Sequence, residues 1–394
     1  MFSSAELARY LRPAGNGHRP SARGLATQLP LQRAVYRVSR DEEIPEAWLK
    51  SLHEVESASL VLIGVPSDAG AGVLRGANYG PEAIRRALLR RRSWLYRDRR
   101  VVDVGDVAVI PYLLHDEMLA SAQLAECRRA LYGSELPVRP VAPLSILERV
   151  VEVIRSRSSA ALLILGGDHS VSWPVAKALA HPKLGIVQLD AHPDLLESSL
   201  GARFTFATWA RHASALLPRG HLVQVGLRVS ERSKEYWEHE LGVRQYWMDD
   251  VGSLGDELAG DVIGELERRA VEDVYLSNDI DGTDAELASA TGAPAADGLS
   301  PKTVKDLIAA LGQRFRIVAS DVVEVAPGLS RRGGEPKKTL EVAADYVEAQ
   351  AAAALRGGSS GANFPDESEV IYYDSVRLWA EEQAEEQAEE REDP

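Results

Sequence analysis

Metal-binding side chains stand in three short groups, each at the end of an apolar run of the sequence. The six residues are His169, Asp190, His192, Asp194, Asp279 and Asp281. Four carboxylates and two imidazoles are more ligands than one small cation needs, and they suit a pair of Mn²⁺-type ions. Two ions about 3.5–4 Å apart are a known means of generating hydroxide near neutral pH. The sequence therefore predicts a binuclear metal site that activates water.

The spacing inside the groups explains how these ligands converge. Asp190, His192 and Asp194 occupy alternate positions after a strand, and alternate positions of an extended chain point to the same side. Asp279 and Asp281 have the same spacing, and two such acids repel each other strongly without a cation between them. Taken singly, residues 190–194 also fit a helix N-cap with solvated side chains, residues 279–281 a surface turn, and His169 an ordinary histidine beside a helix start. The metal interpretation depends on all three groups together.

The apolar runs that carry the groups predict a sheet protein of the α/β class. We expect strands at 60–65, 161–165, 184–189, 222–227, 274–276 and 315–319, and helices at 81–90, 171–180, 261–271 and 301–311. Apolar strands that alternate with helices are typical of a mostly parallel sheet covered on both faces. Ligands of such sheets bind beyond the carboxyl ends of the strands, where all three groups lie.

Composition excludes several other classes of protein. The formal charge of −14 argues against a general nucleic-acid binder, which is usually basic. No apolar run approaches the roughly 18 residues of a membrane span, so we expect no membrane association. A lone cysteine, Cys127, excludes an intrachain disulfide and fits a reducing, cytoplasmic compartment.

Three zones are expected along the chain: an irregular N-terminal extension (1–56), a catalytic domain (57–356), and a linker with an acidic C-terminal tail (357–394). Residues 1–40 hold seven arginines and one acid, a composition also found in transit peptides, but we favour an arm packed on the body or on a neighbouring subunit. The tail carries eight acids between Glu381 and Asp393, typical of a solvated segment. The apolar segment Val370–Tyr373 is a candidate subunit contact.

With further motifs in the body, the three groups resemble the ureohydrolase family of arginases, agmatinases and related guanidino-acid hydrolases. The matching segments lie between about Leu60 and Ala353 and include Gly64–Asp68, Arg75–Arg85, Val225–Arg228 and Ser320–Val325. The resemblance implies an arginase-type three-layer α/β/α fold with a mostly parallel central sheet. It also implies a homo-oligomer, usually a trimer or hexamer.

The resemblance further implies which residues bind two Mn²⁺ ions, although Ni²⁺ or Co²⁺ would also fit the ligands. One ion would take His169, Asp190, Asp194 and Asp279, and the other His192, Asp190, Asp279 and Asp281, so that Asp190 and Asp279 bridge. The ion pair would activate water for attack on a guanidinium carbon.

Two acids have implied roles in the reaction itself. Asp194 would carry a proton to the departing amine. Glu324 would bind and orient the guanidinium through charge-assisted hydrogen bonds, the alternative being a rim carboxylate in an ion pair.

Several positions depart from the family pattern. Phe206 stands where members usually have a proton-shuttling histidine, and a phenyl ring cannot titrate, although His212 is a potential substitute. Leu196 stands where arginases place a polar group for the substrate carboxylate, which favours agmatine or a guanidino acid over arginine. Ala285 replaces a proline, and we expect a looser turn there. Phe204, Phe206 and Trp209 are candidates for an apolar entrance or for the core.

These observations favour a manganese-dependent amidinohydrolase that cleaves an agmatine-like guanidino compound or a guanidino acid to urea and an amine. One alternative is hydrolysis of a formimino or other amidine compound at the same site. Another, motivated by Phe206 and the long extensions, is a metal-binding pseudoenzyme that serves as an assembly or regulatory subunit.

Overall fold

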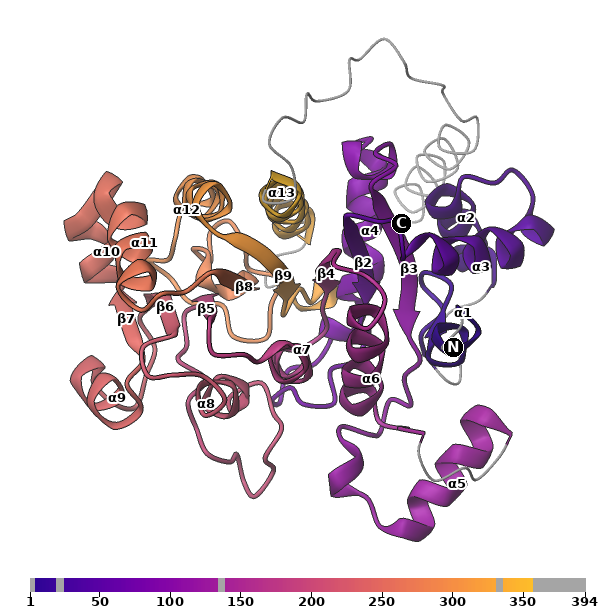
Figure 1. The fold of residues 1–394 in the computed structure, drawn as a ribbon, viewed down its shortest axis with the longest axis horizontal. Helices are drawn as coiled ribbons and strands as arrows, with labels where there is room; N and C mark the ends of the chain where they lie inside the picture. Colours follow the sequence, from indigo (N-terminus) through magenta and orange to yellow (C-terminus); the bar gives the residue numbers. More distant parts are fainter. Residues whose placement is uncertain (1–3, 19–24, 134–138, 331–335, 357–394) are drawn as a thin grey trace, which may run out of the picture.

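A nine-stranded sheet forms the centre of the part of the chain that the computed structural model describes, residues 4–18, 25–133, 139–330 and 336–356 (Figure 1). The strand order is β1-β3-β2-β4-β9-β8-β5-β6-β7. All neighbours are parallel except the edge strand β1, which is antiparallel to β3. The strands are β1 (Leu11–Arg12), β2 (Leu60–Gly64), β3 (Val101–Val107), β4 (Ala161–Leu165), β5 (Leu184–Leu189), β6 (Leu222–Leu227), β7 (Arg244–Trp247), β8 (Asp273–Asp279) and β9 (Arg316–Val323).

Helices cover both faces of the sheet and make the fold three-layered. On one face lie α1 (Ser4–Tyr10), α3 (Ile44–Glu54), α6 (Pro143–Arg155), α7 (Ser172–Leu179) and α8 (Trp209–Ser214). On the other lie α4 (Gly80–Arg90), α10 (Met248–Leu254), α11 (Leu258–Arg268), α12 (Pro301–Arg314) and α13 (Pro336–Arg356). The remaining helices are α2 (Leu25–Tyr36), α5 (Ser121–Tyr132) and α9 (Lys234–Leu241).

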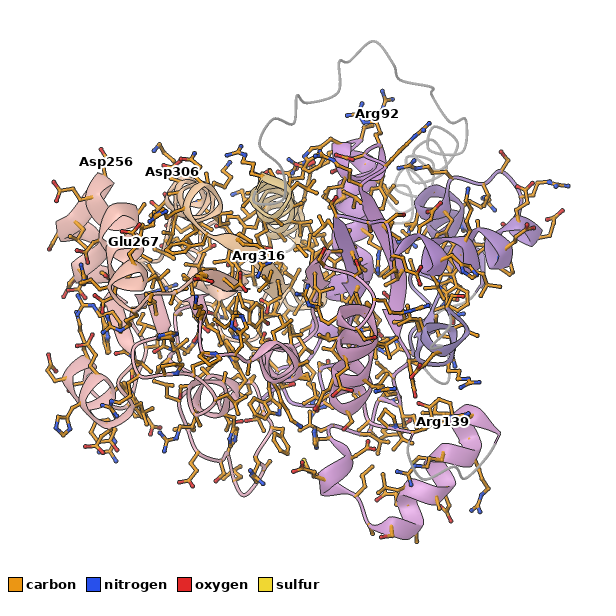
Figure 2. The ribbon with its side chains drawn as sticks, in the orientation of Figure 1. Arg92, Arg139, Asp256, Glu267, Asp306 and Arg316 are labelled. Atoms are coloured by element: carbon orange, nitrogen blue, oxygen red, sulfur yellow. The ribbon has the colours of Figure 1, made fainter. Side chains whose placement is uncertain are left out.

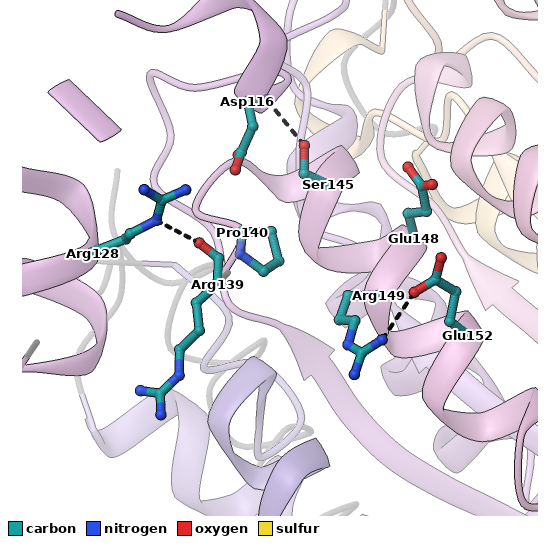
Figure 3. Close-up of a pocket in the computed structure, with 8 residues that line it drawn as sticks. All are labelled: Asp116, Arg128, Arg139, Pro140, Ser145, Glu148, Arg149 and Glu152. Carbon is teal, nitrogen blue, oxygen red and sulfur yellow. Dashed lines mark hydrogen bonds and ion pairs between the residues drawn. The ribbon is translucent and has the colours of Figure 1, made fainter. Parts of the chain in front are cut away.

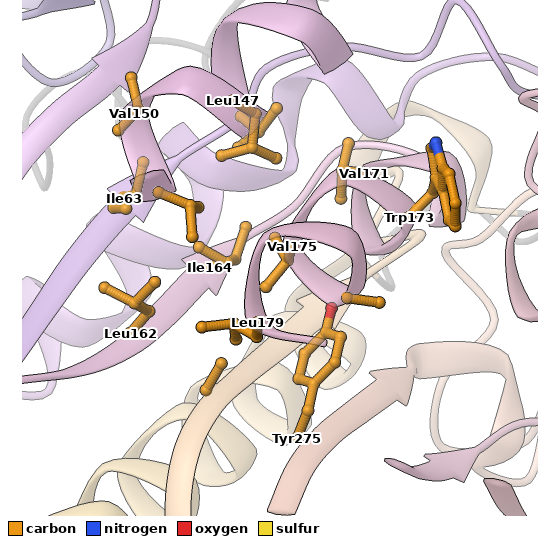
Figure 4. Packing of buried hydrophobic residues seen from close by; sticks show 14 of the residues in the cluster. Ile63, Leu147, Val150, Leu162, Ile164, Val171, Trp173, Val175, Leu179 and Tyr275 are labelled. Carbon is orange, nitrogen blue, oxygen red and sulfur yellow. The ribbon is translucent and has the colours of Figure 1, made fainter. Parts of the chain in front are cut away.

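Alternating side chains of each strand supply the two cores between these layers. In β4, Leu162 and Ile164 pack toward α6 and α7, whereas Leu163 and Leu165 belong to the opposite cluster. Figure 4 shows the first cluster, in which Val175 lies close to Ile164. Burying such a side chain contributes about 1.5–3 kcal/mol, so the two apolar faces fix the central strands firmly.

The predicted α/β class is confirmed, and the strands at 161–165, 184–189 and 222–227 have the predicted bounds. The strands β8 and β9 continue beyond their apolar residues because Ser277 and Asp321 are buried and hydrogen-bonded to each other at 3.1 Å. Strand β3 was not predicted, because two acids interrupt its apolar pattern. Those acids, Asp103 and Asp106, both pair with Arg85, which is buried in α4.

The N-terminal extension was expected to be irregular, and this expectation is wrong for its described residues. They form α1, β1, α2 and α3, and β1 pairs with β3 at the sheet edge. The indole of Trp48 donates to the Val104 carbonyl at 3.0 Å, and the Gly15 amide donates to Asp106 at 2.7 Å. Pro13, Gly15 and Gly17, which suggested irregularity, lie in the connection after β1. The C-terminal segment 357–394, with its predicted linker, subunit contact and acidic tail, lies outside the described residues.

Charged side chains such as Arg92, Asp256 and Asp306 project from the outer surface (Figure 2). A surface hollow of about 280 Å³ between α5 and α6 is also lined by charges (Figure 3). There Arg149 pairs with Glu152 at 3.1 Å, so part of the charge is compensated locally. Among the described helices, none combines the length and hydropathy needed to cross a bilayer.

Candidate metal centre and active site

Four adjacent strands, β4-β9-β8-β5, carry the predicted site residues at their carboxyl ends. His169 lies in the turn after β4, Glu324 directly follows β9, Asp279 ends β8, and Asp190 directly follows β5. Because parallel strands end at the same edge of a sheet, these side chains meet although 155 positions separate His169 from Glu324. The structure therefore brings together all seven predicted site residues.

The first candidate ion position is built around His169, which is fully buried. Its Nδ1 atom lies 3.1 Å from one carboxylate oxygen each of Asp190, Asp194 and Asp279. Among the residues that the structure describes, this nitrogen has no hydrogen-bond partner, while Nε2 lies 2.9 Å from the Ser277 hydroxyl. A buried, unpartnered imidazole nitrogen that faces three carboxylates is the donor set expected around a divalent cation. The residues present thus fit the metal that the sequence predicts.

The second candidate position shares Asp190 with the first. The Nδ1 atom of His192 lies 3.2 Å from Oδ2 of Asp281 and 3.6 Å from Oδ1 of Asp190. Asp190 therefore directs one oxygen toward each histidine, as a bridging ligand does. The ligand atoms of each group of three, His169–Asp190–Asp194 and Asp190–His192–Asp281, lie within 4.8 Å of one another. Asp279 faces the first position, and its bridging to the second remains a prediction.

Crowding of buried acids shifts their proton affinities. Burial, and then the charge of Asp190, raises the pKa of Asp194 to about 7. Burial and the neighbouring Asp281 raise the pKa of Asp279 well above its usual value. Burial alone would lower the pKa of His192, but hydrogen bonds to Asp190 and Asp281 raise it to about 12. The raised pKa values of Asp194 and Asp279 show that the two histidines do not compensate the charge of all the buried acids at this site.

Two of the site residues adopt left-handed backbone conformations. Asp194 has φ +52° and Glu324 has φ +59°, which is uncommon for residues other than glycine and is found at functional sites. Asp190, His192 and Asp194 face the site together as predicted, but the backbone of residues 190–194 is not the simple extended segment that was expected. Asp194 reaches His169 because the chain turns at that residue, whereas Asp190 faces both histidines.

A close approach of two loops fixes the turn that carries His169. A Cβ atom at Gly167 would lie 1.7 Å from the Ser67 carbonyl oxygen, so only glycine fits there. The backbone amide of Glu324 donates to the Gly167 carbonyl at 2.8 Å, and the Glu324 carboxylate accepts from the His169 amide at 2.8 Å. One carboxylate oxygen of Glu324 is thereby used to hold the turn.

The sequence analysis did not predict the hydrogen bonds by which several residues support the ligands. Trp209 donates from its indole to Asp194 at 3.0 Å, and Gln188 donates to Asp190 at 2.7 Å. Ser277 joins His169 to Asp321 through the buried hydroxyl already described. The available signal was the presence of polar residues inside otherwise apolar strands, where a buried polar group needs a partner.

The Arg228 side chain forms hydrogen bonds with the backbone of the loop that carries the third group of ligands, Asp279 and Asp281. Its guanidinium donates to the carbonyl oxygens of Asp281 at 2.8 Å, Ala295 at 2.9 Å and Ala296 at 2.8 Å. It joins the end of β6 to two separate loop segments, so it determines where the backbone of Asp281 lies.

A cavity of about 240 Å³ opens beside the candidate metal positions. Its lining residues are Ala71, Gly72, Val73, Leu74, His192, Asp194, Phe206, Asp279, Asp281, Gly292, Ala293 and Glu324. Of the three aromatic residues proposed for an entrance, only Phe206 lines this cavity, because Phe204 and Trp209 belong to the core. His212 packs against Trp173 and lines a different hollow, so it does not replace the missing histidine.

Two other departures have structural consequences. Leu196 is 39% exposed and lies outside the set of side chains that line the cavity. The turn at Ala285 was expected to be loose without proline, and one backbone hydrogen bond restrains it. The Ala285 amide donates to the Ala295 carbonyl at 3.1 Å, a hydrogen bond that proline could not make.

Comparison with known proteins agrees with this fold and site. The model of the arginase family matches residues 58–352. The mitochondrial agmatinase of Gallus gallus is 31% identical over 291 residues, which cover 69% of this chain and 75% of that protein. The guanidinobutyrase of Pseudomonas aeruginosa is 27% identical over 340 residues, covering 82% and 91% respectively. The solved structure of proclavaminate amidino hydrolase from Streptomyces clavuligerus has a TM-score of 0.60 at 26% identity, covering 76% of this chain and 92% of that one.

The chain belongs to the arginase family. The predicted ureohydrolase recognition and the arginase-type α/β/α fold are thereby confirmed. The predicted enzyme class, a hydrolase that acts on guanidino carbon–nitrogen bonds, is confirmed by the family match together with the agmatinase and guanidinobutyrase relatives.

Proposed function

We propose that the protein is a binuclear, manganese-dependent amidinohydrolase that cleaves a guanidino compound to urea and an amine, with agmatine as the first substrate to test. The supporting observation is the unpartnered Nδ1 atom of His169, which faces three carboxylates 3.1 Å away. Ni²⁺ or Co²⁺ would suit the same ligands, because affinity order alone does not select Mn²⁺.

The chain's own residues divide the remaining work. Two bound divalent cations would lower the pKa of water and offset developing negative charge. Glu324 uses one oxygen to hold the His169 amide, and its Oε2 atom faces the Gly292 side of the cavity, where it can accept from a guanidinium. Asp194 lines the cavity, and its Oδ2 atom accepts from Trp209. In this proposal Asp194 passes a proton to the departing amine.

Phe206 is the position that bears most on turnover. Its ring lines the cavity at the place where family members usually have a histidine, and a phenyl ring cannot take or give a proton there. We expect Phe206→His to raise kcat. Absence of turnover by both proteins at full metal occupancy would instead support the pseudoenzyme alternative.

Metal analysis paired with urea detection tests the proposal. Full-length protein loaded with Mn²⁺ should hold two ions per chain and release urea from agmatine, 4-guanidinobutyrate or arginine. Asp190→Asn should lower occupancy of both positions, because Asp190 faces both histidines, and the surface variant Asp256→Asn serves as a matched control. Activity confined to a formimino compound, without urea, would exclude the proposed reaction.

We also propose a trimeric or hexameric cytoplasmic enzyme without nucleic-acid or membrane partners. Light scattering on the full chain and on a chain lacking residues 357–394 tests the assembly. An unchanged subunit number after the deletion would count against a role of Val370–Tyr373 in subunit contact.

A further inference from the structure

One wall of the active-site cavity is apolar, in contrast to the acidic wall that holds the candidate ligands. We call this wall the apolar rim; it consists of residues 71–74, Phe206 and residues 292–293. Of the described side chains that line the cavity, the ionisable ones are His192 and four acids, and none is a lysine or arginine. Within the cavity, the described side chains of this wall therefore offer a substrate hydrocarbon surface and no cationic group.

The rim begins where the guanidinium would be held. A Cβ atom at Gly292 would lie 3.9 Å from Oε2 of Glu324 and 3.4 Å from the Leu74 carbonyl oxygen. A Cβ atom at Gly72 would lie 3.5 Å from the Phe206 ring, an ordinary van der Waals contact. Gly72 and Gly292 therefore lie along the wall between the Glu324 carboxylate and the outer part of the rim, and neither contributes a polar side chain.

The inner end of the apolar rim is connected by hydrogen bonds to the turn that carries His169, and its outer end is exposed to solvent. The Phe206 amide donates to the Gly70 carbonyl at 3.1 Å, and the Gly70 amide donates to Asp168 at 2.9 Å. Asp168 directly precedes His169, so the inner end of the rim is fixed relative to the ligands. Farther out, Val73 is 98% exposed and Leu74 is 49% exposed. An apolar ligand that covered these two side chains would remove hydrocarbon from water, which is favourable.

We propose, building on the function above, that this site selects guanidino compounds whose substituent is apolar and uncharged, that is, alkylguanidines, over guanidino acids. The stem of an alkylguanidine packs on Phe206, Val73 and Leu74. A carboxylate in the same place would lose water beside the acidic wall and gain no cationic partner, which is unfavourable. Agmatine has the same apolar stem and is accepted where its distal ammonium reaches water.

Four compounds with matched guanidinium groups test this selection: n-butylguanidine, agmatine, 4-guanidinobutyrate and arginine. With Mn²⁺-loaded full-length protein and urea as the readout, we expect kcat/KM for n-butylguanidine to exceed that for 4-guanidinobutyrate by at least about tenfold. Equal or reversed values would overturn the selection and leave the proposed hydrolysis intact. If no compound releases urea, the proposed hydrolysis fails. Calorimetry then compares the binding of n-butylguanidine with that of 4-guanidinobutyrate. Tighter binding of n-butylguanidine supports the selection, and equal or weaker binding overturns it.

Variants of the rim separate selection from general damage. Val73→Arg should shift the ratio of the two kcat/KM values toward 4-guanidinobutyrate by about tenfold, because it supplies the missing cation, whereas Val73→Gln should not. Phe206→Ala should lower kcat/KM for n-butylguanidine more than for methylguanidine, which is too short to reach the outer rim. Tyr112→Ala, which removes an exposed aromatic ring outside the cavity lining, is the matched control. An unchanged ratio in Val73→Arg would contradict the proposal.

Discussion

The hydroxyl group of Ser277 contacts His169 of the first candidate metal position at Nε2, the ring nitrogen that faces away from the carboxylates. Its Oγ atom lies 2.9 Å from Nε2 of His169 and 3.1 Å from both carboxylate oxygens of Asp321. The hydroxyl can donate its one proton to Asp321 and accept from the imidazole N–H. This arrangement leaves the Nδ1 lone pair of His169 directed at the three carboxylates, so we expect Ser277→Ala to weaken metal binding.

The magnitude follows from the burial of both partners. The variant leaves a fully buried imidazole N–H without an acceptor, at a cost of about 1–3 kcal/mol. Loss of a group that orients a metal-binding histidine typically lowers metal affinity about 10–100-fold, or roughly 1.4–2.7 kcal/mol. The two ranges overlap, so the metal-free protein should be destabilised and the affinity for the first ion reduced to a similar extent.

A neighbouring serine supplies the control. Ser320 in β9 is equally buried, but its hydroxyl has no hydrogen-bond partner in the described part of the chain, so Ser320→Ala should leave metal affinity nearly unchanged. Competition between the protein and a chromophoric chelator measures affinity, and thermal unfolding with and without chelator measures stability. If Ser277→Ala binds Mn²⁺ as tightly as the wild type, or if both variants weaken binding equally, the orienting role of Ser277 is wrong.

Three further outcomes follow from the structure. Arg228→Met should lower the free energy of unfolding by about 1–3 kcal/mol and reduce metal occupancy, measured by urea denaturation and metal analysis, because several loop carbonyls lose their donor. The pKa of Asp194 is raised to about 7 in the folded protein without metal. Between about pH 4 and 7, the folded protein therefore keeps a proton on Asp194 that the unfolded chain has already released. The stability that this proton provides is lost as pH rises through 7, by about 1 kcal/mol between pH 6 and 8, so unfolding in the presence of chelator should occur at lower temperature at pH 8. Metal binding competes with this proton, so the metal affinity should rise between pH 6 and pH 8. Equal metal affinities at pH 6 and pH 8 would contradict this reasoning. Arg85→Met should lower the free energy of unfolding, measured by urea denaturation, by about 3–5 kcal/mol, because Asp103 and Asp106 stay buried without their cationic partner.

The central strands were predictable because their side chains are apolar on both faces. The runs 161–165 and 184–189 have no polar interruption before Gln188, and burial between two helix layers selects such sequences. Strand β3 was missed because Asp103 and Asp106 are stabilised by Arg85, which lies on another element 18 and 21 positions earlier. Hydrophobic patterns report burial, but they do not report which buried charges will find a counterion.

The sequence by itself determined the kinds of ligand and their spacing, since Asp190, His192 and Asp281 are recognisable from chemistry and position alone. Only the tertiary structure decided that β9 and β8 lie between β4 and β5, which brings the ligands of separate segments to one point. It also decided the left-handed turns at Asp194 and Glu324 and the placement of the apolar rim beside the acids. The physical reason is that strand order and strained backbone conformations depend on contacts between distant segments, whereas local patterns encode only burial and chain direction.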